Sequence, residues 1–280
     1  MEAISGAQIA GEIKARLRND NAGQGLMPCL AVILVGSQED SAMYVRLKEK
    51  ATLDVGGRFC LETLPEAVSG PALLGLIERL NRDDTVDGII LQLPLPEHLE
   101  PQREIFLKAI DPLKDVDGFH QENRGGLLGG EPAFTSCAAL ACLEVIERYA
   151  QPLRDKRVLL VGESFDLIMP LALLLMKARC RVTVLPEPPG ELLDNCDIAV
   201  IEKGGAGIIK SLGQDGPGLV LDAGFYVTQQ GLQGNADRER LSRYSGRLLP
   251  VPGGMGPILI AKLMENVTLA ARRRAACRNS

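Results

Sequence analysis

The sequence lacks several features that would point to particular classes of protein. Its 280 residues include only two histidines, and none of its seven cysteines forms a Cys-x-x-Cys pair. We therefore expect no zinc or other metal site. The net charge is -5, and the one cationic run, Arg272–Arg274, is typical of a solvated helix end. Because phosphate contacts need a basic excess, this balance argues against nucleic-acid binding.

Long apolar segments are also missing. No uninterrupted apolar run approaches the roughly 18 residues that span a bilayer, so we expect no membrane segment. The first residues, Met-Glu-Ala-Ile-Ser, show no basic start followed by an apolar core, so no secretory signal is expected. Most cysteines lie in apolar stretches and are interpreted as reduced core residues. These features favour a cytoplasmic protein.

Strand-like and helix-like patterns alternate along the whole chain. Apolar runs at 29–35, 88–93 and 157–162 predict buried parallel strands, and the stretches between such runs predict helices on the faces of the sheets. The glycine-rich stretch 112–135 is interpreted as the crossing between two domains. The sequence therefore predicts an α/β protein with two domains, the second a Rossmann-like, doubly wound parallel sheet.

Polar side chains in the first half stand at positions suited to chemistry. Tyr44 and Lys48 lie four residues apart, which places them on one face of a predicted helix with Cβ atoms about 6 Å apart. Gln92 ends a predicted strand, where open α/β sheets place ligand-contacting groups, and Asp117 follows another turn at a sheet end. Converging on one cleft, these groups could bind and protonate a flat heterocycle. Taken alone, the Tyr44 and Lys48 pair is also typical of an exposed helix face.

Four segments carry a resemblance to a known family. They are Tyr-Val-x-x-Lys at 44–48, Gln-Leu-Pro-Leu-Pro at 92–96, Lys-Asp-Val-Asp-Gly at 114–118 and Pro-Val-Pro-Gly-Gly-x-Gly-Pro at 250–257. In this order and spacing the sequence resembles the bifunctional methylenetetrahydrofolate dehydrogenase/methenyltetrahydrofolate cyclohydrolase family. The resemblance covers nearly the whole chain.

The resemblance implies a role for each matching position. Lys48 would be the catalytic lysine and Gln92 its hydrogen-bonding partner. Tyr44 would complete the catalytic group and stack on the folate, while Asp117 would grip the donor edge of the pterin ring. The other substrate-binding residues would be Pro252, Gly253 and Gly254, in a loop that closes over the substrate.

The resemblance also assigns the two domains. Residues 1–122 together with 257–280 would form the folate-binding catalytic domain, so the last helix would pack back on the first domain. Residues 123–256 would form the Rossmann-like, dinucleotide-binding domain. The family further suggests a homodimer formed through this second domain.

The second domain departs from the family pattern at the dinucleotide-binding turn. The family shows Gly-x-Ser-x-x-x-Gly-x-Pro; this chain keeps Gly162 and Ser164 but has Ile168 at the second glycine. Glu163 and Asp166 add negative charge. A branched side chain at a close-approach glycine blocks the backbone from a pyrophosphate, and acids repel it. We therefore interpret Gly162 and Ser164 as a vestigial cofactor site with weak or absent NADP or NAD binding.

Further departures lie in the same half, at Leu185–Pro186, Ser136–Ala139, Lys203–Ala206 and Leu259. Losing two charge-assisted contacts of roughly 1.5–3 kcal/mol each would weaken cofactor affinity by about two to four orders of magnitude. Glu187 is the opposing indication. It lies about where an acid would hold the ribose hydroxyls of NAD, which suggests a change of cofactor.

Four hypotheses follow. The leading one is a methenyltetrahydrofolate cyclohydrolase centred on Lys48, with weak or lost NADP-dependent dehydrogenase activity. The second transfers the methylene unit of methylenetetrahydrofolate, without redox change, to an amine-type acceptor as a second small molecule. The third is a full bifunctional dehydrogenase/cyclohydrolase using NADP or NAD. The fourth is a non-catalytic folate-binding scaffold, which would have no physical need for the lysine.

Overall fold

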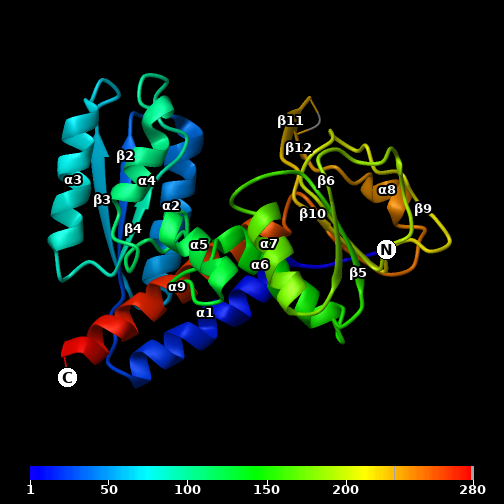
Figure 1. Ribbon diagram of the computed structural model, residues 1–280, viewed down its shortest axis with the longest axis horizontal. Helices are drawn as coiled ribbons and strands as arrows, with labels where there is room; N and C mark the ends of the chain where they lie inside the picture. The colour runs from blue at the N-terminus through cyan, green and yellow to red at the C-terminus, as the bar shows by residue number, and fades with distance from the viewer. Residues whose placement is uncertain (230, 279–280) are drawn as a thin grey trace. The chain divides into compact units, whose positions relative to one another are not determined.

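The computed structural model describes residues 1–229 and 231–278, and the chain packs as two compact units, each around its own sheet (Figure 1). Residues 11–137 and the chain from 260 onward form the three-stranded unit. Residues 1–10 and 138–259 form the six-stranded unit. This is the predicted two-domain α/β architecture, and the last helix returns to the first half of the chain as expected.

The two units differ from the expected domain boundaries in three places, one of which is residues 257–259, which pack with the six-stranded unit. Residues 1–10 pack with the six-stranded unit because β1 (Glu2–Ala3) pairs in parallel with β13 (Arg247–Leu249). Residues 123–137 pack with the three-stranded unit, and the expected irregular crossing contains a helix, α5 (Gln121–Gly129). The assignment of a function to each predicted domain stays a prediction.

The helix α5 forms despite its glycines because tertiary hydrogen bonds hold it. The Nδ1 atom of His120 accepts from the N–H of Glu122 at 3.1 Å and caps the first turn. Inside the helix, the buried Asn123 amide donates to the Asp115 carboxylate at 2.8 Å. The helix ends at Gly129 and is capped by Gly130, whose φ of 97° suits glycine. These contacts override the low helix propensity of glycine, which misled the sequence-based prediction.

The sheet of the six-stranded unit is parallel throughout, in the order β1-β13-β10-β8-β5-β6. The chain passes from β5 to β6 on one side and then to β8 on the other, so the strand order reverses at β5. Ligands of doubly wound sheets bind outside the carboxyl ends of the strands at such a reversal. The further elements of this unit are β5 (Arg157–Val161), β6 (Arg181–Leu185), β8 (Ile198–Ile201), β10 (Leu219–Asp222), β7 (Leu192–Leu193), β9 (Ser211–Leu212), α6 (Cys137–Tyr149), α7 (Ile168–Lys177) and α8 (Arg238–Leu241).

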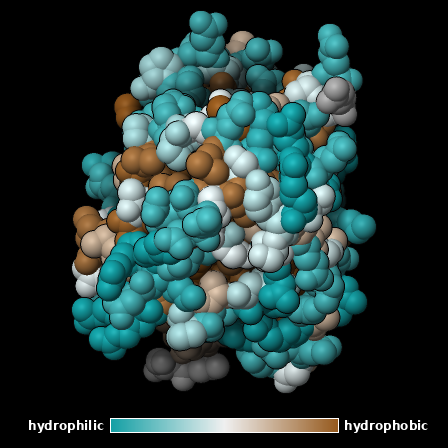
Figure 2. Space-filling model, turned by 90° about the vertical axis from the view of Figure 1, so that its right-hand side faces the viewer, coloured by the Kyte–Doolittle hydropathy of each residue, from teal (hydrophilic) through white to brown (hydrophobic). Residues whose placement is uncertain are grey.

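Hydrophobic side chains lie exposed on parts of the surface. Figure 2 shows a cluster of them on a face that is otherwise largely hydrophilic. In the six-stranded unit, β11 (Tyr226–Thr228) pairs with β12 (Gly231–Gln233). Val227 on β11 is 83% exposed, and the neighbouring Phe225 is 57% exposed. Across the described residues, no helix combines the length and apolar character needed to cross a membrane.

The sheet of the three-stranded unit is also parallel. Its central strand β2 (Cys29–Val35) pairs with β3 (Arg58–Leu64) on one side and with β4 (Gly88–Leu91) on the other. Both β2 and β4 are buried along their whole length, which explains their continuous apolar sequence. The helices of this unit include α2 (Glu39–Asp54), α3 (Gly70–Arg82), η1 (Glu100–Gln102), α4 (Arg103–Ala109) and α5; α1 (Gly6–Gly23) and α9 (Met255–Arg278) continue into it from the six-stranded unit.

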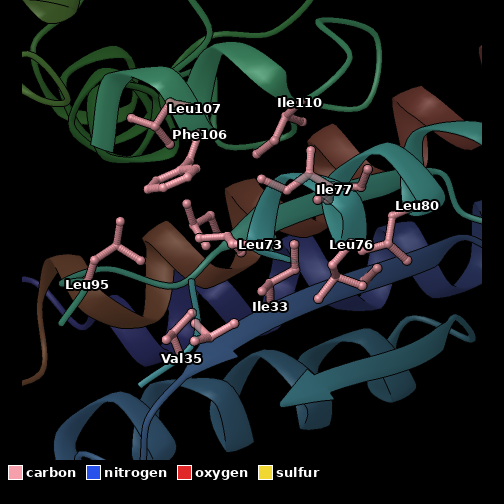
Figure 3. Close-up of a cluster of buried hydrophobic side chains, with 14 of the residues drawn as sticks. Ile33, Val35, Leu73, Leu76, Ile77, Leu80, Leu95, Phe106, Leu107 and Ile110 are labelled. Atoms are coloured by element: carbon pink, nitrogen blue, oxygen red, sulfur yellow. The ribbon is translucent and has the colours of Figure 1, made fainter. Parts of the chain in front are cut away.

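The core of this unit lies between β2 and the helices α3 and α4. Figure 3 shows Ile33 and Val35 of β2 facing side chains of α3, with Phe106 of α4 above them. The Ser69 hydroxyl accepts from the N–H of Ala72 at 3.4 Å and starts α3. The buried residues of α3 recur at helical spacing, as expected for an amphipathic helix: Leu73, Leu76, Ile77 and Leu80.

A buried carboxylate fixes the turn that precedes α5. Asp115 accepts from the N–H groups of Phe119 at 3.1 Å and His120 at 2.8 Å, in addition to the Asn123 amide. Burial raises the pKa of Asp115 to about 6, although these hydrogen bonds oppose the rise. Gly118 has a φ of 73°, and a Cβ there would lie 2.7 Å from the backbone of a neighbouring segment. Only glycine therefore fits at this position of the turn.

Replacing Phe106 with alanine should destabilise the three-stranded unit. The Phe106 side chain is 0% exposed, so truncation leaves a cavity, and we expect the free energy of unfolding to fall by about 3–5 kcal/mol. The matched control is Ile105→Ala, because Ile105 lies on the same helix but is 54% exposed. Equal losses for the two variants in urea unfolding would contradict the packing described here.

The pH dependence of stability tests the environment of Asp115. An acid whose pKa is raised on folding contributes stability below its unfolded pKa and loses it as the pH rises through the folded pKa. The pKa of Asp115 rises from 3.8 to about 6. Between about pH 4 and about pH 7, the wild type should therefore lose up to about 3 kcal/mol relative to Asp115→Asn. The exposed Glu97→Gln serves as control; identical pH profiles for all three proteins in urea unfolding would rule out a raised pKa.

Candidate active site

A buried hydrogen bond joins two of the predicted catalytic residues. Lys48 on α2 is 8% exposed, and its Nζ donates to Oε1 of Gln92 at 2.9 Å. Gln92 directly follows β4, and its N–H donates to the carbonyl of Ile33 at 2.9 Å. The side-chain Nε2 of Gln92 donates to the carbonyl of Leu93 at 2.7 Å, which directs Oε1 toward the lysine. The ammonium is therefore held in one place at the end of the sheet.

Two further predicted residues lie in the same unit. Tyr44 is half-buried, one turn before Lys48 on α2. Asp117 is half-buried in the turn fixed by Asp115. Asp115 itself forms a parallel β-bridge with Ile89 of β4. Asp117 comes two residues after that bridge and so lies toward the carboxyl end of β4, where Gln92 begins.

Cys137 is buried in the same unit, and the sequence reasoning did not name it as a candidate site residue. Its Sγ donates to the carbonyl of Val116 at 3.5 Å. Burial raises the pKa of the Cys137 thiol, the charge of Asp117 adds to the rise, and the charge of Lys48 opposes it. Both charged groups therefore act on this one thiol. The sequence indicates Cys137 only as part of a departure from the family pattern, because nothing local shows that the chain after α5 returns to Lys48.

The six-stranded unit holds the predicted cofactor residues Gly162 and Ser164. Gly162 follows β5 with a φ of 136°. The Ser164 hydroxyl accepts from the N–H groups of Leu167 at 3.3 Å and Ile168 at 3.1 Å, at the start of α7. The strand, glycine turn and helix N-terminus that bind dinucleotide phosphates are therefore all present.

The residues expected to obstruct this turn differ in their placement. Ile168 is 0% exposed, and its Cγ1 would lie 3.0 Å from a Cβ built on Gly162. Glu163 is exposed and pairs with Lys203 at 3.3 Å. Lys203 also pairs with Glu187 at 2.8 Å. The negative charge of Glu163 and Glu187 is therefore partly balanced by Lys203, which follows the neighbouring strand β8. The sequence of the turn alone does not indicate this pairing.

The predicted substrate loop is fixed by close backbone contacts. It lies between β13 and α9, and Gly253 has a φ of 90°. The N–H of Gly6 donates to the carbonyl of Gly253 at 3.0 Å, and a Cβ on Gly6 would lie 1.8 Å from the carbonyl oxygen of Gly254. The predicted site residues are divided between the two units. The six-stranded unit contains the loop residues Pro252, Gly253 and Gly254 and the cofactor residues Gly162 and Ser164. The three-stranded unit contains Lys48, Gln92, Tyr44 and Asp117.

Models of one protein family match both halves of the chain. The model of the tetrahydrofolate dehydrogenase/cyclohydrolase catalytic domain matches residues 4–117. The model of the NAD(P)-binding domain of the same family matches residues 136–275.

Individual relatives match over nearly their whole length. Bifunctional protein FolD 1 of Syntrophomonas wolfei is 54% identical over 276 residues, which cover 98% of this chain and 100% of that protein. The crystal structure of FolD from Campylobacter jejuni has a TM-score of 0.87 at 34% identity, covering 98% of this chain and 99% of that one. The Trypanosoma brucei enzyme, in complex with NADP and an inhibitor, has a TM-score of 0.84 at 28% identity, with 98% of each chain covered.

These comparisons bear on the hypotheses drawn from the sequence. They do not support the expectation of weak or lost dehydrogenase activity, nor the doubt about a nicotinamide cofactor, and they favour the bifunctional alternative. That expectation relied on single positions in the turn and at four further places in the second half of the chain, whereas the strand, glycine and helix around the turn are retained. Since the family models cover both units, the chain belongs to the tetrahydrofolate dehydrogenase/cyclohydrolase family.

Proposed function

We propose that this protein is a bifunctional enzyme that oxidises methylenetetrahydrofolate and hydrolyses the methenyl product. The observation that carries the proposal is the buried 2.9 Å hydrogen bond between Lys48 and Gln92, in the same unit as Asp117. Family membership and the FolD relatives support it further. The amine-acceptor and scaffold hypotheses have no comparable observation behind them.

The hydrolytic step needs a proton carrier. The methenyl form holds an amidinium carbon; water attacks it, a C–O bond forms and one C–N bond breaks. Of the two protons of the water, one passes to the departing nitrogen and the other is released to solvent. We assign this proton transfer to Lys48, because its Nζ is held in one direction by Gln92. A lysine that moved freely would spend less time in a reactive geometry.

The remaining substrate contacts are assigned by side-chain chemistry. Asp117 accepts from the N–H donors of the pterin edge, and charge-assisted bonds of this kind are stronger than neutral ones. Tyr44 offers an aromatic face for stacking from the turn before Lys48. Pro252, Gly253 and Gly254 keep their predicted role as a substrate-binding loop.

The oxidative step needs a nicotinamide dinucleotide, NADP or NAD, which supplies a hydride acceptor when it is bound. The frame after β5 fits its pyrophosphate: Gly162 allows close approach of the backbone, and Ser164 orders the first turn of α7. Glu187 and Lys203 lie at strand ends on either side of β5. We assign Gly162 and Ser164 to cofactor binding.

Mutation of Lys48 tests the hydrolytic assignment. Lys48→Met removes the proton carrier, and we expect at least about a hundredfold lower rate of decay of methenyltetrahydrofolate absorbance. Lys50→Met is the matched control, because Lys50 is exposed on the same helix. Equal rates for the wild type and Lys48→Met would show that another group moves the proton.

We further propose that the enzyme is a cytoplasmic homodimer formed through the six-stranded unit. Exposed apolar side chains such as Val227 favour association. Light scattering should give the mass of two chains for the wild type. Val227→Glu should shift the protein toward one chain, whereas Leu128→Glu, at an exposed position of the three-stranded unit, should not. A wild type with the mass of one chain contradicts the assembly.

A further inference from the structure

The crevice at the strand reversal of the six-stranded unit already holds a carboxylate of the chain itself. Glu202 directly follows β8, and its N–H donates to the carbonyl of Val161, the last residue of β5, at 2.9 Å. A Cβ built on Gly162 would lie 2.4 Å from Oε2 of Glu202. The carboxylate is therefore packed against the glycine at which a dinucleotide would approach the backbone.

This carboxylate lies at the turn whose donors would bind a phosphate. The Ser164 hydroxyl accepts from the N–H groups of Leu167 and Ile168, and the Glu202 carboxylate reaches the same turn over Gly162. Burial raises the pKa of Glu202, the Ser164 hydroxyl opposes this, and the nearby charge of Asp166 adds to the rise. Backbone N–H groups at a strand-to-helix turn are the donors that bind anions in proteins. Here the side chain of Glu202 lies over that turn.

The other charged or titratable groups near Glu202 are Lys203 and the thiol of Cys142. Lys203, the next residue along, pairs with Glu163 and Glu187. From α6, the buried thiol of Cys142 has its pKa raised by burial first and by the charge of Glu202 second. Glu202 thus lies at the turn that a pyrophosphate would need.

We propose that Glu202 is an intrachain competitor of the cofactor pyrophosphate. The side chain must leave the turn before a nicotinamide dinucleotide can bind there, so Glu202 sets the cofactor affinity of this enzyme. The inference rests on the proposed function, because it takes the dinucleotide as the ligand. Its physical basis is that the carboxylate fills the space over Gly162, and that two anions in one crevice repel each other.

Calorimetric titration of NADP and of NAD into the whole protein tests this inference. Glu202→Gln removes the charge and keeps the shape, whereas Glu202→Ala removes the competing group. Each variant should bind the preferred cofactor about ten- to a hundredfold more tightly than the wild type. Glu191→Gln is the matched control: Glu191 is an exposed glutamate of the same unit whose lysine partner is Lys210, and its loss should leave the affinity unchanged.

The outcomes separate this inference from the proposed function. Unchanged or weaker binding in both Glu202 variants, with a wild type that oxidises methylenetetrahydrofolate, overturns the inference and leaves the function in place. Binding that is measurable only in the Glu202 variants supports the inference and contradicts the dehydrogenase half of the function. If none of the proteins binds either cofactor, both fail, because the turn then takes no pyrophosphate.

Discussion

The arrangement of the candidate active site depends on the hydrogen bond between Lys48 and Gln92. Burying an ammonium group is unfavourable unless a polar partner accepts a hydrogen bond from it, and the Gln92 Oε1 is that partner. The parallel pairing of β2 with β4 determines the position of Gln92 at the end of the sheet. The helix α2 determines the position of Lys48 beside Gln92. The register of the strands therefore fixes the position of the Lys48 Nζ, and proton transfer needs a donor that is fixed in this way.

The same rule of parallel sheets governs the other unit. Functional groups follow directly after buried strands, since the carboxyl ends of parallel strands share one edge. After β5 this edge carries Gly162 and Ser164, and after β8 it carries Glu202. Two strand ends that are neighbours in space thus bring a phosphate-binding turn and an acid into contact. The turn at Gly162 and Ser164 has the form that binds a dinucleotide, and the carboxylate of Glu202 lies over that same turn.

Sequence patterns could predict the parts of this protein that are set locally. The apolar runs predicted β2 and β5 because strands buried on both faces carry little but apolar residues. The spacing of Tyr44 and Lys48 predicted their shared helix face, and the order of four motifs pointed to the family. The pairing of β1 with β13 was not predictable, because its two partners are distant in the chain.

The sequence could not show contacts that depend on the path of the chain. The charges of Asp117 and Lys48 act on the thiol of Cys137, which nothing in the local sequence indicates. The doubt about the cofactor came from departures from the family pattern, in the turn and elsewhere in the second half of the chain. The group that lies closest over Gly162 in the structure comes instead from a different strand end, at Glu202.

The final folate product tests the central claim most directly. The protein is incubated with methylenetetrahydrofolate and NADP or NAD, and the product is identified by mass spectrometry while nicotinamide absorbance is recorded. The account predicts formyltetrahydrofolate together with an equal amount of reduced nicotinamide. Unchanged methylenetetrahydrofolate with both cofactors, or reduced nicotinamide with methenyltetrahydrofolate accumulating at the uncatalysed rate of hydrolysis, would contradict it.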